Sequence, residues 1–324
     1  MVKKEEKQTL NLPFTGISTF GKYPVCPNIN DLQSVNADVA VIGVPNDMGT
    51  QWKSGARMGP RSVREGSTLY SFGLDGAYDI ENDITYLGPK WKVFDVGDVD
   101  IVHGDLMQSH ENTTESVQQI VNNKVMPVVI GGDHSITPAI GEGVKDLGPF
   151  HVLQIDAHLD WADHRSGQRY GHGSSIRRLS EMEHVKNIYQ FGIRGISSSL
   201  KEDVEAARDY GATILSPKQM RQKGVEQLVE MIPKGEKLYI TIDIDGIDPS
   251  IAPGTGTPSP GGLQYDEVNE LLKAVAKHNE VVAFDLVEVA PTYDPTGMTG
   301  QTAARIMLDL LSYVLKEREY KEGR

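Results

Sequence analysis

The stretch HVLQIDAHLD, residues 151–160, begins as an apolar run of strand length and ends with Asp156, His158 and Asp160 at every second position. Period-two spacing places these three side chains on one face for as long as the chain stays extended. Reactive side chains of α/β proteins gather at the carboxyl ends of parallel strands. The stretch therefore predicts a strand of an α/β sheet with a polar site at its end.

Apolar runs of strand length recur along the whole chain and alternate with helix-length segments, which predicts a parallel sheet in an α/β protein. Several runs are rich in Val and Ile without polar alternation, as expected when helices cover both faces of the sheet. The predicted strands are 38–44, 92–96, 126–132, 151–157, 187–193, 212–216, 237–244 and 280–289. The predicted helices lie near 60–70, 109–124, 136–146, 174–183, 199–210, 222–232, 264–278 and 302–318. About eight strands leave two architectures open, an open three-layer sheet and a closed (β/α)₈ barrel.

The composition narrows the class of protein. The 324 residues carry a formal net charge of −13, which argues against nucleic acid or an anionic membrane as partner. No apolar run approaches the roughly 18 residues of a membrane helix, the polar N-terminus lacks the apolar core of a secretory signal, and a single cysteine suits a reducing compartment. No linker divides the chain. We therefore expect a cytoplasmic protein with one domain over 1–324, including an N-terminal extension of about 1–35 and a charged tail of about 316–324.

Two further polar clusters directly follow apolar runs. VVIGGDHS contains His134, and TIDIDGIDPS contains Asp243 and Asp245. Buried carboxylates packed closely repel one another and lose hydration, and divalent cations remove both difficulties. Carboxylate oxygens with a minority of imidazole suit Mn²⁺, and also Fe, Co, Ni or Zn. Three such clusters at three strand ends predict a metal centre.

The motifs GGDHS, DAHLD and DIDGIDPSIAPGTGTPSPGG resemble those of the ureohydrolases, the arginase–agmatinase superfamily. Segments 43–64, 95–99 and 284–294 extend the resemblance over nearly the whole chain, in the family's order. The resemblance implies a single three-layer α/β/α domain with an eight-stranded parallel sheet rather than a barrel. It also implies two Mn²⁺ ions per chain, with Ni²⁺, Co²⁺ or Zn²⁺ left open, and a homo-oligomer, either a trimer or a hexamer. The implied reaction is hydrolysis of a guanidino group to urea and an amine.

The family's ligand positions are all intact in this chain, and the resemblance implies two ligand sets that share Asp156 and Asp243. One metal ion would be bound by His134, Asp156, Asp160 and Asp243, and the other by Asp156, His158, Asp243 and Asp245. A hydroxide held between two cations would attack the guanidinium carbon, and the metals with carboxylates such as Asp156 would stabilise the tetrahedral intermediate.

Two catalytic roles outside the ligand set are also implied by the resemblance. Glu288, in the VEV segment, would grip the substrate guanidinium by paired hydrogen bonds. His172, in GHGSS, would contact the substrate from a loop and deliver the proton that the leaving amine needs.

Substrate choice is expected to lie in the loops around the site, because the common chemistry uses only the guanidinium group. Arginases carry acidic residues after a strand-end GLR, and this chain has GIRGISSS at 192–199. They also carry a Thr–Asn–Ser-type loop after DAHTD, and this chain has WADHRSGQRYGHG at 161–173. Without either anchor, arginine is a poor candidate, and we expect an agmatinase-like enzyme that converts agmatine to putrescine and urea. Guanidinobutyrate, guanidinopropionate, and free or methylated guanidine stay open as alternatives.

The loop after Asp160 holds the residues that bear on those alternatives. Trp161 could narrow the substrate pocket toward guanidine, or it could pack the loop on the sheet. Four arginines could contact a substrate carboxylate, although a solvated helix start is the plainer interpretation of the last two: Arg165, Arg169, Arg177 and Arg178. A single-zinc deacetylase is disfavoured, because one metal would not need both Asp243 and Asp245.

Overall fold

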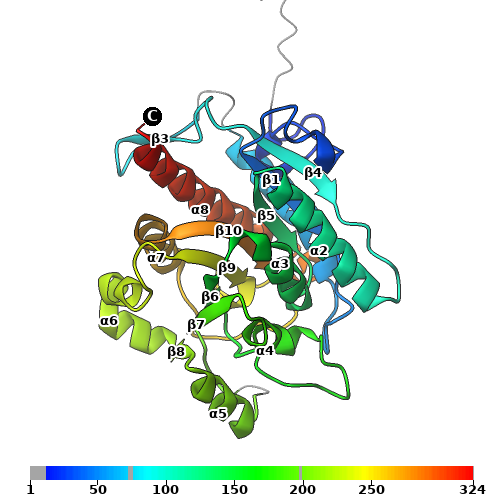
Figure 1. The fold of residues 1–324 in the computed structure, drawn as a ribbon, viewed down its shortest axis with the longest axis vertical. Coiled ribbons are helices and arrows are strands. Elements are labelled where there is room, and N and C mark those ends of the chain that lie inside the picture. Colours follow the sequence, from blue (N-terminus) through cyan, green and yellow to red (C-terminus); the bar gives the residue numbers. More distant parts are fainter. Residues whose placement is uncertain (1–11, 72–75, 197–198, 324) are drawn as a thin grey trace, which may run out of the picture.

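Eight parallel strands form one open sheet in the computed structural model, which describes residues 12–71, 76–196 and 199–323 (Figure 1). The strand order is β4-β1-β5-β10-β9-β6-β7-β8, and every neighbouring pair is parallel. The open sheet confirms the three-layer prediction and excludes the barrel. The strands are β1 (Val39–Val44), β4 (Val93–Asp98), β5 (Met126–Gly131), β6 (Phe150–Ile155), β7 (Val185–Phe191), β8 (Thr213–Leu215), β9 (Lys237–Asp243) and β10 (Glu280–Val287).

Helices cover both faces of the sheet, because successive side chains of each strand point to opposite sides. In β1, Val39 and Val41 join the hydrophobic cluster beneath one helical layer, whereas Ala40 and Ile42 join the cluster beneath the other. Figure 1 shows α2 and α3 on one side and α8 on the other. The first layer contains α2 (Leu106–Asn122), α3 (Thr137–Gly143), α4 (Ser175–Ser180) and α5 (Lys201–Tyr210). The second contains α1 (Gly59–Ser67), α6 (Pro217–Glu230), α7 (Tyr265–His278) and α8 (Met298–Glu322).

Both ends of the chain contact this body, although the first described residues, 12–18, are largely exposed. Phe20 is fully buried, and its backbone N–H donates to Oδ2 of Asp95 in β4 at 2.8 Å. Residues 1–11 and Arg324 lie outside the described residues. At the other end, α8 continues to Glu322, so the charged segment that begins near 316 is the last part of a helix. Among the described residues, no helix combines the length and the hydropathy needed to cross a membrane.

A two-stranded antiparallel hairpin lies outside the main sheet and was not predicted. Its strands are β2 (Ala77–Asp79) and β3 (Ile84–Tyr86). Tyr86 stacks edge-to-face on Tyr313 of α8, with 5.6 Å between the ring centroids. The hairpin is therefore attached to the helical layer rather than to an edge of the sheet.

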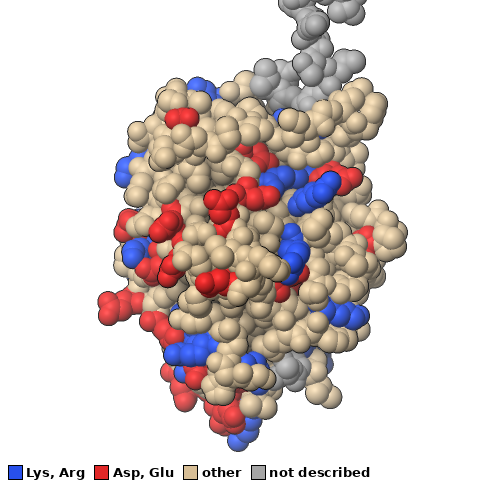
Figure 2. Space-filling model, turned by 90° about the vertical axis from the view of Figure 1, so that its right-hand side faces the viewer, with Lys and Arg blue, Asp and Glu red and all other residues tan. Residues whose placement is uncertain are grey.

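Four adjacent strands at the centre of the sheet, β5, β10, β9 and β6, end at the same edge. Each of them leads directly into one of the polar segments singled out above, which contain His134, Glu288, Asp243 and Asp156. The candidate site therefore lies where the sheet is most enclosed. On the face shown in Figure 2, acidic and basic side chains are interspersed. The basic side chains do not form the continuous positive patch that nucleic acid would need on this face.

Candidate metal centre

His134 is held at the end of β5 by a tight turn that begins at Gly132. A Cβ atom on Gly132 would lie 2.0 Å from the carbonyl oxygen of Asn46, so no larger residue fits there. Asp133 accepts the N–H of Ser135 at 3.1 Å and so starts the short helical turn that carries His134. The N–H of His134 itself donates to Oε1 of Glu288 at 2.9 Å. The backbone of His134 is thereby tied to the residue that follows the neighbouring strand β10.

The DAHLD segment does not stay extended, which corrects the one-face expectation from its period-two spacing. Strand β6 ends at Ile155, and Oδ1 of Asp156 accepts the N–H of His158 at 2.5 Å, closing a turn. Asp160 adopts a left-handed backbone conformation with φ of 52°. As a result Asp156 and Asp160 face His134, whereas His158 turns toward Asp245.

Asp243 is the last residue of β9, and Asp245 lies in the helical turn that follows it. Oδ1 of Asp243 accepts the N–H of Asp245 at 2.8 Å, which fixes the relative placement of the two carboxylates. Asp245 in turn accepts the N–H of Ala157 at 3.1 Å and the hydroxyl of Thr257 at 2.9 Å. These bonds link β9 to β6 at the level of the site.

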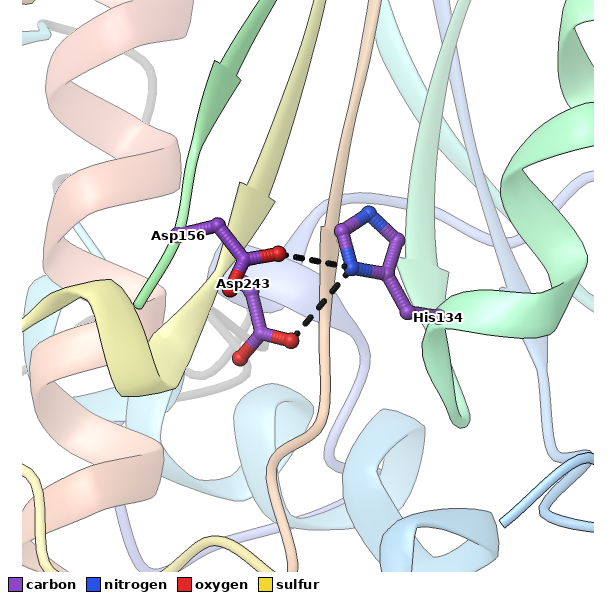
Figure 3. Close-up of side chains that lie close together, drawn as sticks. All are labelled: His134, Asp156 and Asp243. Atoms are coloured by element: carbon purple, nitrogen blue, oxygen red, sulfur yellow. Dashed lines mark ion pairs between the residues drawn. The ribbon is translucent and has the colours of Figure 1, made fainter. Parts of the chain in front are cut away.

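The first group of side chains surrounds Nδ1 of His134. This atom lies 3.1 Å from Oδ2 of Asp156 and 3.4 Å from Oδ2 of Asp243 (Figure 3). It also lies 3.0 Å from Oδ2 of Asp160. The ligand atoms of His134, Asp156 and Asp243 all lie within 4.8 Å of one another. All four residues of the first predicted set therefore meet.

The second group surrounds His158. Its Nδ1 atom lies 3.0 Å from Oδ2 of Asp245 and 3.6 Å from Oδ1 of Asp156. The ligand atoms of these three residues also lie within 4.8 Å of one another. Asp156 belongs to both groups, as a bridging residue must. Asp243, the other predicted bridge, belongs by these distances to the first group only, with His134 and Asp156.

The electrostatics of the two groups fit a pair of divalent cations. Nδ1 of His134 is buried and makes no hydrogen bond, so its lone pair or proton faces only carboxylates. Burial, Asp245 and Asp156 raise the pKa of Asp243 well above the usual range of an aspartate. Burial alone would lower the pKa of His134, but contact with Asp156 raises it well above the usual value. Cations at this position would stabilise the ionised carboxylates and accept the imidazole nitrogens as ligands.

His172 and Glu288 meet beside the first group. Nδ1 of His172 lies 3.0 Å from Oε1 of Glu288, and the backbone N–H of His172 donates to the carbonyl of Gly49. Burial would lower the pKa of His172, but the hydrogen bond and charge of Glu288 raise it to about 9. Glu288 is 2% exposed and has a left-handed φ of 66°, a strained conformation that functional sites often hold.

Comparison with known proteins agrees with this geometry. The model of the arginase family matches residues 37–312. The chain belongs to the arginase family. It is 32% identical to guanidinobutyrase from Pseudomonas aeruginosa over 308 residues, 92% of each chain. It is 34% identical to agmatinase from Bacillus subtilis over 281 residues, 85% of this chain and 91% of the relative. The structure of proclavaminate amidinohydrolase from Streptomyces clavuligerus matches with a TM-score of 0.80 at 31% identity, covering 94% of this chain and 99% of that one.

As a member of the arginase family, the chain is a ureohydrolase that acts on linear amidine C–N bonds. The relatives named above differ in substrate, so membership gives the reaction class and leaves the guanidino compound open. The choice of substrate therefore depends on the side chains around the metal centre.

The four arginines of the loop and of helix α4 each pair with acidic side chains. Arg165 pairs with Asp203 at 3.1 Å. The others pair with two acidic residues near α4, Asp163 and Glu181, at distances between 2.8 and 3.7 Å: Arg169, Arg177 and Arg178. These pairs give each arginine a structural partner, which disfavours contact with a substrate carboxylate. Arg178 is only 3% exposed, so the expected solvated helix start does not describe it.

Trp161, expected to contact substrate, is placed in the core instead. Its side chain is 1% exposed, and its ring lies 5.5 Å from that of Tyr210 in α5. A ring buried this fully presents no surface to a substrate, because the loop that carries it folds inward onto the sheet. The structure thus favours the packing role of Trp161.

Within the segment 192–199, Arg194 holds the turn that carries the proposed ligand Asp245. The guanidinium of Arg194 donates to five backbone oxygens, including those of Asp245 at 2.7 Å and Gly246 at 3.2 Å. It thereby fixes the turn that presents Asp245. Residues 197 and 198 of this segment lie outside the described residues.

Sequence reasoning missed several polar residues that lie inside apolar strands. Gln154 precedes Asp156 by two positions, and Thr241 precedes Asp243 by two, so each points to the same face as the ligand after it. Asp285 lies in the middle of β10. All three are fully buried. Gln154 and Asp285 could have been noticed as amide and charged side chains within strands otherwise made of apolar residues. Thr241 gives no such signal, because threonine is common in strands.

Proposed function

We propose that the chain hydrolyses the guanidino group of a small molecule to urea and an amine, using two divalent cations, Mn²⁺ first among them. One observation carries the proposal: two imidazoles and four carboxylates from three strand ends converge around the shared Asp156. Agmatine, which would yield putrescine, is the first substrate we propose.

Two bound divalent cations would lower the pKa of a water molecule and so supply hydroxide near neutral pH. The first group, centred on His134, would hold one ion, and the second group, centred on His158, would hold the other. Asp156 would contribute a carboxylate oxygen to each ion, because it belongs to both groups. These assignments follow the two groups and the predicted ligand sets.

The role proposed for Glu288 is to bind and orient the guanidinium. Its carboxylate is buried next to His134, and it already accepts hydrogen bonds in this region. A guanidinium presents parallel N–H donors that match a carboxylate well. Held in this way, the planar guanidinium carbon faces the first group of ligands.

His172 is proposed to supply the proton that the leaving amine needs. In the reaction the oxygen of water bonds to the guanidinium carbon, the bond from that carbon to the alkyl nitrogen breaks, and this nitrogen departs with an added proton. The contact with Glu288 raises the pKa of His172 to about 9, so the imidazole carries a transferable proton at neutral pH.

A second candidate substrate class, the guanidino acids, is favoured by Lys53. Its Nζ atom lies 4.5 Å from the ring of Trp52 and 5.2 Å from the ring of Tyr293, five positions after Glu288. The side chain is exposed, and it forms no ion pair among the described residues. Lys53 is two positions after Gln51, and the backbone nitrogen of Gln51 lies 3.3 Å from Nε2 of His172. An exposed cation on this loop suits a substrate carboxylate.

The deciding experiment measures urea release by the Mn²⁺-loaded protein with agmatine, 4-guanidinobutyrate, guanidine and arginine. Turnover of agmatine above the others supports the first proposal, and preference for guanidinobutyrate supports the second. Turnover of arginine would contradict the argument from the missing anchors. An Asp156→Asn variant assayed in parallel controls for contaminating activity. If no compound yields urea with Mn²⁺, Ni²⁺ or Co²⁺, the proposed reaction is wrong for these substrates.

A further inference from the structure

Four buried polar side chains form a row across the sheet, one step below the ligands. Gln190, Gln154, Thr241 and Asp285 are paired in register on β7, β6, β9 and β10. All four are 0% exposed. We call them the polar row. Four adjacent strands rarely place polar side chains at one buried level unless each is hydrogen-bonded, because unpaired polar groups are costly there.

One half of the polar row holds Asp156. Nε2 of Gln154 donates to Oδ2 of Asp156 at 2.6 Å, and Nε2 of Gln190 donates to Oε1 of Gln154 at 2.6 Å. The direction of these two hydrogen bonds is fixed, because an ionised carboxylate can only accept hydrogen bonds. The amide nitrogen of Gln154 therefore has to face Asp156. Gln190 is anchored by a further bond to the carbonyl of Leu159 at 2.7 Å.

The other half holds His134. Oγ1 of Thr241 lies 3.0 Å from Nε2 of His134 and donates to Oδ1 of Asp285 at 2.8 Å. Tyr239 donates to the other oxygen of Asp285. A hydroxyl has one proton, so once Thr241 donates to Asp285 it can only accept from His134. The proton of the neutral imidazole is thus kept on Nε2, and Nδ1, which faces the three carboxylates, is left free to bind a cation.

We infer that the polar row positions the first ligand group through two separate contacts, Thr241 to His134 and Gln154 to Asp156. Its members are positioning residues, since none of them belongs to either group of ligand atoms. The inference rests on the proposed dinuclear centre, and it adds that different members of the polar row affect different metal ions. Thr241 and Asp285 act on one ion only, whereas Gln154 acts on both ions through the shared carboxylate.

Titration of the metal-free protein with Mn²⁺ by calorimetry tests this division without any substrate. Thr241→Val keeps the shape of the side chain and removes the hydroxyl. It should weaken one of two Mn²⁺ equivalents by about 10- to 100-fold, the usual effect of losing a group that orients a ligand. The other equivalent should stay within about threefold of the unmodified protein. Thr241→Ser retains the hydroxyl and should restore the lost affinity.

Gln154→Leu should weaken both equivalents, because Asp156 belongs to both groups. Thr113→Val is the matched control: Thr113 is equally buried, but its hydroxyl donates to Ser109 within α2. It should leave both affinities unchanged. Thermal unfolding of each metal-free variant shows whether it is folded. If Thr241→Val does not fold, the Mn²⁺ affinities of Gln154→Leu still test the inference, and normal binding of both equivalents by that variant would contradict it.

Two outcomes would overturn the inference: normal binding of both equivalents by Thr241→Val, or equal weakening of both by Thr241→Val while Thr113→Val is normal. A different result would count against the proposed function instead. If the unmodified protein bound fewer than two equivalents of Mn²⁺, the dinuclear centre itself would be wrong.

Discussion

Oε1 of Glu288 accepts the backbone N–H of His134 at 2.9 Å and lies 3.0 Å from Nδ1 of His172. One carboxylate oxygen therefore contacts both a proposed metal ligand and the proposed proton donor. A guanidinium that binds to Glu288 has to replace or share the contact with His172. In the proposed reaction, substrate binding and the release of the protonated imidazole toward the leaving amine would be coupled through this oxygen.

Glu288→Gln should lower kcat/KM for urea release by about 100-fold, equivalent to about 2.7 kcal/mol of barrier. The amide keeps the shape of the side chain but loses the charge that balances the guanidinium. Mn²⁺ content should be unchanged, because Glu288 belongs to neither group of ligands. Urea assays and metal analysis of the same preparation test both statements. Loss of metal from the variant would show that Glu288 supports the centre rather than the substrate.

The contact between His172 and Glu288 should make the stability of the metal-free protein depend on pH. The folded pKa of His172 is about 9, above the ordinary value of 6.5. Its contribution is therefore fully present below about pH 6.5 and is lost as the pH rises through about 9. Denaturant unfolding, followed by circular dichroism between pH 6 and 10, should show a steeper loss of stability for the unmodified protein than for Glu288→Gln. Identical slopes would contradict the coupling.

Asp156→Asn should remove the bridging carboxylate from both groups at once. We expect urea release to fall by on the order of 1,000-fold, or about 4 kcal/mol of barrier, together with loss of bound Mn²⁺. Asp163→Asn is the matched control, because Asp163 lies on the same loop with its side chain 57% exposed. The prediction is wrong if Asp156→Asn retains two ions and full activity.

Trp161→Ala should lower the free energy of unfolding by about 3–5 kcal/mol, the usual cost of truncating a buried aromatic side chain. Trp161→Phe retains most of the packing against Tyr210 and should cost less. Because the ring is buried, KM for every guanidino compound should be the same in Trp161→Phe as in the unmodified protein. A change in the preference between guanidine and agmatine would restore the substrate-binding role.

Lys53→Met should separate the two proposed substrate classes. If a guanidino acid is the substrate, removal of the cation should raise KM for 4-guanidinobutyrate by about 10-fold, since a charged hydrogen bond contributes about 1.5–3 kcal/mol. KM for agmatine should not rise. Arg165→Gln serves as the control, because Arg165 already pairs with Asp203. An equal effect of Lys53→Met on both compounds would mean that Lys53 does not bind the carboxylate.

Much of the fold could be predicted because the strands are buried on both faces. Runs such as VVAFDLV are apolar enough to stand out, and all eight strands of the sheet lie where the sequence places them. Helix α6 begins at Pro217, earlier than predicted, because Ser216 and Gln219 cap it and a break at Gly224 interrupts its pattern. The β2–β3 hairpin was missed because three-residue strands are too short to show a period.

The ligands could be predicted because their residue types are rare at strand ends, but their arrangement could not. Spacing alone does not show that Asp160 turns through a left-handed conformation or that His158 leaves the face of Asp156. Nor does it show that Trp161 points into the core. The polar row was missed for a related reason: Thr241 and Gln154 gain meaning only when three strands distant in sequence are placed in register.

The position of β10 ties the metal centre to completion of the chain. This strand comes last in sequence, yet it lies between β5 and β9 and joins the two halves of the sheet. During synthesis, His134 and Asp243 would belong to two unconnected half-sheets, each with an unpaired apolar edge, until residues 280–287 have emerged from the ribosome. A chain truncated before this point would have unpaired strand edges prone to association. Its first ligand group would be divided between the two half-sheets, whereas the second group lies within the half that contains β6 and β9. Metal binding by the first group would therefore require a chain that is complete through β10.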